Sequence, residues 1–150
     1  MPVLTHAPSA VVRQLVIDLA LATDRTADPE GAWPAFATSE PDRPDSVITV
    51  YDTVGRDQGR LNGSGDALDQ PGVQVRVRAT NHPDGHAKAS AIRAGLLGVY
   101  DQAVTVGANQ YLVHAVTRVR QVAALGRDVP SASGRRVLTF DATVCLKQLT

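Results

Sequence analysis

Cysteine is almost absent from this sequence, since Cys145 is the only one in 150 residues. A single thiol excludes a disulfide within the chain and a metal site built from several cysteines. Cys145 lies in an alternating apolar pattern near the C-terminus. We therefore expect a small buried hydrophobe at this position rather than a nucleophile.

Long apolar runs are missing as well. No stretch approaches the roughly 20 apolar residues that a transmembrane helix needs. Residues 1–6 (Met-Pro-Val-Leu-Thr-His) lack the basic flank and apolar run of a secretion signal. We expect no membrane partner and a protein that stays in the cytoplasm where it is made.

Neither sign of charge is in excess. Fifteen Lys and Arg residues balance fifteen Asp and Glu residues, so the formal net charge is zero. Nucleic-acid binders usually carry a basic excess, because phosphate contacts supply most of their affinity. The balance argues against DNA binding, and the absence of self-repulsion permits self-association.

Aromatic residues make up only 4% of the chain, whereas hydrophobic residues reach 43%. The core must therefore be built mainly from Val, Leu, Ile and Ala. The length is typical of one domain with one core, and we find no internal repeat. We predict a single domain over residues 1–150.

Two segments have helical spacing of apolar residues. The first runs from Ser9, a candidate N-cap, to about Thr23. The second follows Thr80 and Asn81 and runs to about Tyr100, with Pro83 and Asp84 suited to its first turn. Its expected packing residues are Ala87, Ala91, Ile92, Leu96 and Val99.

Alternating or β-branched residues predict strands at 47–53, 73–78, 111–120 and 136–149, with a turn region at 126–135. Four prolines exclude regular structure over most of residues 24–45. There Trp33 and Phe36 either pin the segment to the body or dock a partner. Residues 54–72 read as a polar, glycine-rich loop. The order predicts an α+β fold, a mostly antiparallel sheet with two main helices packed on one face.

No constellation of residues predicts an active site. Gly63-Ser64-Gly65-Asp66 lacks the further glycine of a dinucleotide fingerprint and the Gly-Lys-Ser/Thr of a P-loop. His82 and His86 are four residues apart, but nothing in the sequence supplies a third metal ligand. No serine stands in a Gly-x-Ser-x-Gly elbow. We expect no catalytic residue, no metal and no cofactor.

Arginine pairs are the main candidates for contacts. Arg76 and Arg78 share one face of a strand, and Arg118 with Arg120 can do the same on another. These faces contact water, DNA phosphates or acidic groups of a neighbouring subunit, and the zero net charge favours the subunit over DNA. The predicted interface residues are Arg76, Arg78, Arg118, Arg120, Arg127, Asp128, Arg135 and Arg136.

Two segments in order carry a family resemblance. Residues 69–78 (Asp-Gln-Pro-Gly-Val-Gln-Val-Arg-Val-Arg) precede the alanine-rich stretch 87–96 (Ala-Lys-Ala-Ser-Ala-Ile-Arg-Ala-Gly-Leu). The combination is similar to the core of phage minor capsid and tail-terminator proteins of long-tailed bacteriophages. Leu125-Gly126-Arg127-Asp128 and the strand that follows resemble the closing hairpin of the same proteins. The proline-rich segment 24–45 and the glycine-rich insert before Asp69 depart from that pattern.

The resemblance implies a structural virion protein of the tail or neck, assembled in the host cytoplasm. Such proteins form a ring, commonly a hexamer, that caps the tail tube protein and meets a head-side connector or stopper protein. The genome passes through the channel without specific binding, and neither catalysis nor a cofactor is required. Alternatives are a head-completion or connector (neck) protein, a small cytoplasmic enzyme, and a nucleic-acid-binding module.

Overall fold

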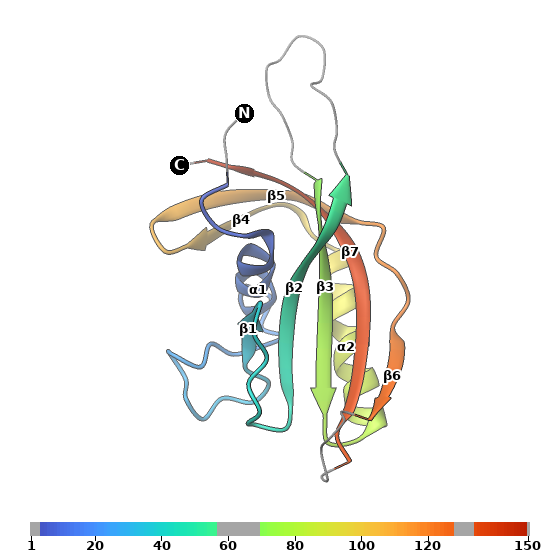
Figure 1. The fold of residues 1–150 in the computed structure, drawn as a ribbon. Coiled ribbons are helices and arrows are strands. Elements are labelled where there is room, and N and C mark those ends of the chain that lie inside the picture. Colours follow the sequence, from blue (N-terminus) through green and yellow to red (C-terminus); the bar gives the residue numbers. More distant parts are fainter. Residues whose placement is uncertain (1–3, 57–69, 128–133, 150) are drawn as a thin grey trace.

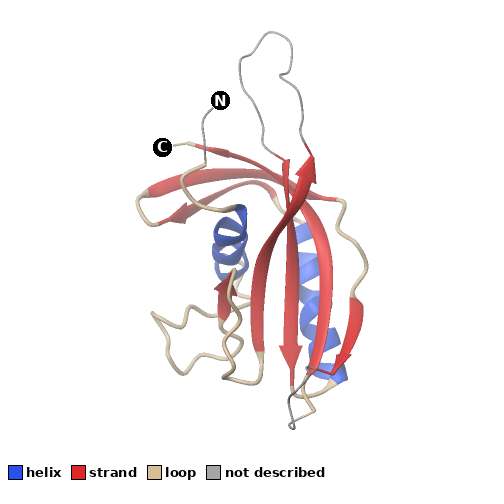
Figure 2. Cartoon of the chain, in the orientation of Figure 1, coloured by secondary structure: helices blue, strands red, loops and turns tan. Residues whose placement is uncertain are grey.

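The computed structural model describes residues 4–56, 70–127 and 134–149, which form two helices and seven strands (Figures 1 and 2). In chain order these elements are α1 (Pro8–Asp18), β1 (Ala35–Ala37), β2 (Val47–Arg56), β3 (Gln70–Ala79), α2 (His82–Leu97), β4 (Tyr100–Val106), β5 (Asn109–Thr117), β6 (Ala123–Arg127) and β7 (Arg136–Gln148). None of the described helices is long and apolar enough to cross a membrane.

All seven strands belong to one curled sheet with the order β1-β2-β3-β7-β5-β4, and β6 also pairs with β7. β7 is the centre of this sheet, because it pairs with β3 along one edge and with β5 and β6 along the other (Figure 1). The short β1 pairs in parallel with β2, whereas the other strand pairs are antiparallel. The α+β prediction is confirmed, but the sheet is mixed rather than purely antiparallel.

Both helices pack on the same face of the curled sheet. α1 contacts β1 to β4, and α2 contacts β3, β5 and β7. The predicted alternation of β3 is confirmed, since Val73, Val75 and Val77 are buried in the core that the two helices share. On β7, the apolar residues at alternate positions of the predicted strand 136–149 are buried as well: Leu138, Phe140, Ala142, Val144 and Leu146.

α1 begins and ends differently from the prediction. Ala7 is the N-cap, and Ser9 is buried within the first turn. Ser9 donates hydrogen bonds from its backbone N (2.9 Å) and from Oγ (2.8 Å) to the Asp52 carboxylate of β2. This carboxylate therefore meets the positive end of the helix dipole and satisfies a free N–H group. The helix stops at Asp18 instead of continuing to Thr23.

The C-terminus of α1 is a Schellman motif formed without glycine. Leu21 N donates to Val16 O (3.1 Å) and Ala20 N donates to Ile17 O (2.9 Å), while Ala20 has a φ of 60°. Glycine is the usual residue at such a left-handed position, because it has no Cβ. The sequence therefore carries no stop signal there, and the prediction ran past the true end.

α2 begins where the sequence predicts, but the face that it buries differs from the predicted one. Asn81 caps the helix by accepting a 2.9 Å hydrogen bond from Asp84 N. Ile92 and Leu96 are buried as expected, but Ala87 and Ala91 are exposed. The helix packs instead through the row Gly85, Ala89, Ile92 and Leu96, because Gly85 faces Leu138 with no room for a Cβ.

Three strands were not predicted. β1 lies within the proline-rich segment, β4 directly follows α2, and β6 covers residues 123–127. Both strands that flank the predicted loop at 54–72 extend into it, since β2 continues to Arg56 and β3 already begins at Gln70. Residues 57–69 and 128–133, where the rest of that loop and most of the predicted turn fall, lie outside the described residues.

Candidate interface surfaces

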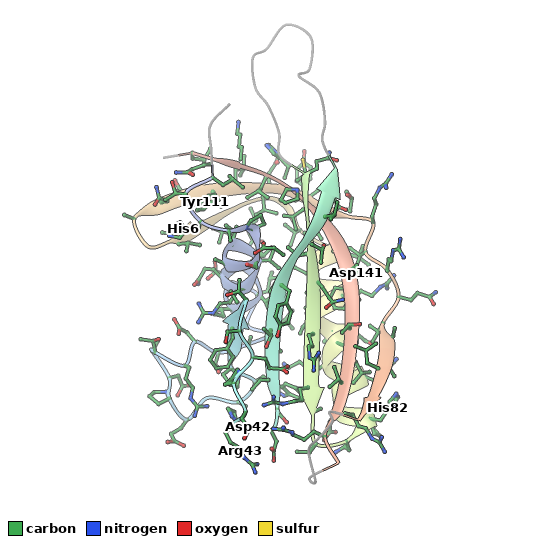
Figure 3. The ribbon with its side chains drawn as sticks, viewed as in Figure 1. His6, Asp42, Arg43, His82, Tyr111 and Asp141 are labelled. Atoms are coloured by element: carbon green, nitrogen blue, oxygen red, sulfur yellow. The ribbon has the colours of Figure 1, made fainter. Side chains whose placement is uncertain are left out.

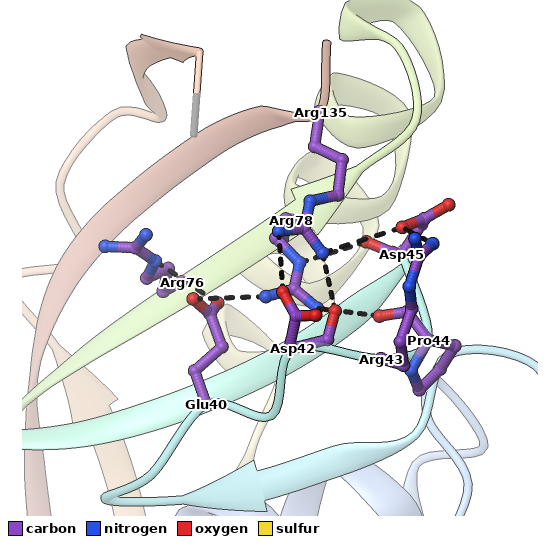
Figure 4. Close-up of polar contacts among 8 residues, drawn as sticks. All are labelled: Glu40, Asp42, Arg43, Pro44, Asp45, Arg76, Arg78 and Arg135. Carbon is purple, nitrogen blue, oxygen red and sulfur yellow. Dashed lines mark hydrogen bonds and ion pairs between the residues drawn. The ribbon is translucent and has the colours of Figure 1, made fainter. Parts of the chain in front are cut away.

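The outer face of β3, opposite the core, carries Arg76 and Arg78, because side chains alternate along a strand. The segment Thr38–Asp45 crosses over this face (Figure 4). Together they form a group that we call the arginine–carboxylate cluster: Glu40, Asp42, Asp45, Arg76, Arg78 and Arg135.

Arg78 is the most buried member, with a side chain that is only 2% exposed. Its Nη2 donates to Pro44 O (2.7 Å) and Asp42 O (3.0 Å), and its Nε donates to Asp45 O (3.2 Å). Glu40 Oε2 lies 3.5 Å from Nη1. A buried cation needs both a counter-charge and hydrogen bonds, and the Thr38–Asp45 segment supplies both.

Arg135, directly before β7, attaches the same segment. It donates from Nη1 to Asp42 O (2.5 Å) and from Nη2 to Asp42 Oδ1 (3.1 Å). Arg76 is more exposed, and its Nε donates to Glu40 Oε1 at 3.2 Å. The sequence predicts that the β3 face with Arg76 and Arg78 contacts water or a partner. In the structure, the segment that carries Glu40, Asp42 and Asp45 covers this face.

Glu40, Asp42 and Asp45 were not predicted as site residues. They lie in the proline-rich segment, where aspartate is common in turns for its local hydrogen bonds, and no local pattern links the carboxylates to arginines more than 30 residues away. The main signal available from the sequence was that Arg76 and Arg78 are two residues apart, which places them on the same face of a strand. That spacing implies a shared environment without identifying what provides it.

Arg118 and Arg120 lie apart from the cluster, in the linker between β5 and β6, and both are exposed. Arg136 is half-buried on β7 and pairs through its backbone with Arg127 of β6. Asp128 lies outside the described residues. Among the predicted interface residues, the structure thus brings together Arg76, Arg78 and Arg135. Their role between subunits stays a prediction.

A second feature is an open groove of about 690 Å³ between α2 and the segments 31–34 and 44–46. The exposed Ala87 and Ala91 line it, together with Trp33 and Lys88. Lys88 Nζ lies 5.5 Å from the centre of the Trp33 ring, and burial lowers the pKa of Lys88. Trp33 also packs against the core, which confirms that it pins the proline-rich segment to the body.

The histidines have structural contacts. The rings of His82 and His86 stack at 5.9 Å on the exposed start of α2. Tyr111 is fully buried, and its hydroxyl accepts a 2.9 Å hydrogen bond from His6 N and lies 2.8 Å from His6 Nδ1 (Figure 3). This pair fastens the N-terminal segment to β5. The described residues contain no group of three or more His, Cys, Asp or Glu side chains placed to hold a metal ion.

These features define an α+β domain in which buried arginines hold the segment 38–45 against the outer face of the sheet. The family model for bacteriophage tail terminator proteins matches residues 15–147. The chain therefore belongs to the bacteriophage tail terminator family and is a component of the phage tail.

Other comparisons add little to this assignment. No protein of curated function matches the chain. One solved structure, of a protein named only by a sequence identifier, covers 94% of this chain and 93% of its own. It is 13% identical with a TM-score of 0.43, a level of similarity that says nothing about function.

Proposed function

We propose that this protein forms a closed ring, of six copies, that caps the tail tube and joins it to the head-side connector. The observation that carries the proposal is the match to the tail terminator family over residues 15–147. The ring stops polymerisation of the tube protein and leaves a channel through which the genome passes. This role requires no cofactor and no catalysis.

The architecture supports a role in assembly. β1 and β4 are edge strands of the sheet, and edge strands are ready sites for pairing with another chain. Five large apolar side chains are also exposed among the described residues: Val54, Leu97, Tyr100, Leu125 and Leu149. Surfaces of this kind suit a small subunit that contacts its own copies, the tube and the connector.

The proposal is tested by tube growth. Tube protein from the same phage is polymerised with and without this protein, and tube lengths are measured by negative-stain microscopy. We expect this protein to shorten the tubes and to leave ring-shaped density at one end. Tubes of unchanged length without terminal density would contradict capping.

The neck alternative is tested in the phage itself. A phage that lacks this gene is expected to make overlong tails that do not attach to heads. Tails of normal length that fail to attach would identify a head-completion or connector protein instead. Complementation with the wild-type gene is the control in both cases.

A further inference from the structure

The linker between β5 and β6 is a large bulge in the sheet. Thr117 pairs with Thr143 of β7, and Ala123 pairs with Thr139. The five linker residues 118–122 therefore lie opposite only the three residues 140–142 of β7. Bulges bend a strand and re-aim its side chains, and Arg118 here adopts a φ of 51°.

The bulge is held in a fixed position. Arg120 N donates to Asp141 O (2.9 Å). From the other side, Arg93 of α2 donates from Nε to Arg120 O (2.9 Å) and from Nη2 to Val119 O (3.5 Å). The backbone is thus anchored both to β7 and to α2, so the exposed side chains of Arg118 and Arg120 project from a rigid support.

Arg118 and Arg120 line a groove of about 470 Å³, together with residues 53–55 and 141–143. Neither guanidinium forms a hydrogen bond or ion pair with any other described residue. The carboxylate in the groove, Asp141, accepts a 3.4 Å hydrogen bond from Gln74. The groove therefore presents two arginines that are ready to bind an acidic group, and arginine is suited to carboxylates.

An acidic tip of matching charge lies at Asp28-Pro29-Glu30. Both acidic residues are exposed, and neither carboxylate forms a hydrogen bond or ion pair with another described residue. Asp24 in the same loop is already occupied, because Thr26 N and Arg13 Nη2 donate to its Oδ1 at 2.9 and 3.1 Å. Those contacts lower the pKa of Asp24, the Thr26 hydrogen bond most of all. Arg25 is the cation of the loop.

The arginine groove and the acidic tip lie on opposite sides of the molecule. In Figure 1 the loop that carries Asp28 and Glu30 extends at the lower left, while the linker between β5 and β6 runs along the right. Two different, complementary surfaces on opposite sides cannot meet within one copy. They fit a head-to-tail contact between copies, which closes into a ring when the rotation between neighbours allows it.

We infer that Asp28 and Glu30 of one copy dock onto Arg118 and Arg120 of the next copy, and that this contact connects neighbours around the ring. The inference rests on the proposed ring, for which it names the contact surfaces and the direction of assembly. It also explains how a chain with zero net charge carries exposed and unpaired charges of both signs. The pairing steers association and selects one orientation.

The test uses two reciprocal charge reversals in the full chain. One variant carries Arg118→Glu and Arg120→Glu, and the other carries Asp28→Arg and Glu30→Arg. Each variant alone places like charges at every contact, so we expect loss of the ring and a monomeric mass by light scattering. Mixed in equal amounts, the two variants can alternate with opposite charges at every contact, and we expect rings with an even number of subunits.

A variant with all four substitutions is the matched control. It keeps the net charge at zero and restores complementarity within one chain, so it should form rings by itself. Circular dichroism and thermal melting of every variant check that the fold is intact. If the reversed variants form rings as the wild type does, the two surfaces do not meet and the inference is wrong.

Two further outcomes also overturn the inference. Rings lost in the arginine variant and not restored by the mixture or by the fourfold variant would mean that the arginines contact another surface. If the arginine variant still forms rings but phage assembled with it retains less DNA, the two arginines line the channel instead. In these cases the proposed function stands, whereas a wild type that forms no rings in solution or on tube ends contradicts the proposed function itself.

Discussion

At the scale of single residues, Arg76 and Arg78 show how two neighbouring arginines on one strand face take different roles. Both contact Glu40, but their side chains are 27% and 2% exposed. Arg78 also donates three hydrogen bonds to backbone carbonyls. Exposed ion pairs contribute little to stability, whereas removing one partner of a buried pair leaves an unsatisfied charge.

We therefore expect Arg78→Ala to lower the free energy of unfolding by about 3 kcal/mol, since it removes a buried cation and leaves the carbonyls of Pro44 and Asp45 without their donor. Arg76→Ala should cost about 1 kcal/mol or less, because Glu40 keeps Arg78. Urea denaturation of both variants measures the difference. Equal costs for the two substitutions would mean that the segment Thr38–Asp45 does not seal Arg78 from water in solution.

Cys145 gives a second prediction for a single residue. Burial raises the pKa of its thiol, and a hydrogen bond with the Gln70 side chain offsets part of that effect. A raised pKa reduces the thiolate fraction at a given pH, and the thiolate is the reactive form. We expect slow modification by a disulfide reagent at pH 8 in the native protein and fast modification in denaturant. Rapid native labelling would show that β7 exposes Cys145.

At the scale of elements, β3 illustrates how burial decides the effect of a charge. Val75 is fully buried in the centre of the sheet, whereas Val54 at the end of the neighbouring β2 is 98% exposed. Val75→Asp should prevent folding, because it places a carboxylate in the core without a partner. Val54→Asp, the same change on the adjacent strand, should leave the melting temperature almost unchanged. A folded Val75→Asp protein would contradict the assignment of the strand's faces.

Elements with strong local signals were predicted from the sequence, and those without them were not. The cap Asn81 and the alternation of β3 and β7 identified these elements. The end of α1 was missed because Ala20 occupies a position where glycine is the usual signal. β4 was missed because the apolar spacing of α2 continues through Val99, although Gly98 already caps the helix.

The candidate surfaces were predictable to a smaller extent. The arginines were identified as candidates because their spacing places them in pairs. The partners of Arg78 and Arg135 lie on a segment that is separated from them by 33 to 93 residues, and contacts at such separation leave no local pattern. The bulge that directs Arg118 and Arg120 depends on the register of β5 and β6 against β7, which composition and periodicity do not determine.

At the scale of the whole molecule, a net charge of zero conceals an uneven distribution. The linker that carries the exposed Arg118 and Arg120 and the loop that carries the exposed Asp28 and Glu30 lie on opposite sides, while the arginines of the arginine–carboxylate cluster are paired within the chain. Total charge governs solubility and long-range repulsion, whereas separated patches give a subunit a direction. A head-to-tail ring needs such a direction.

This distribution leads to a prediction about ionic strength. Exposed charges are screened over about 10 Å at 0.1 M salt and about 3 Å at 1 M, so rings joined through Asp28, Glu30, Arg118 and Arg120 should dissociate as sodium chloride rises over this range. The fourfold reversed variant should follow the same curve, because its contacts are equally ionic. Rings that strengthen in sulfate instead would be held by apolar contacts, with Tyr100 and Leu125 as the exposed side chains to replace next. Light scattering across the salt series therefore separates an ionic from an apolar contact between subunits.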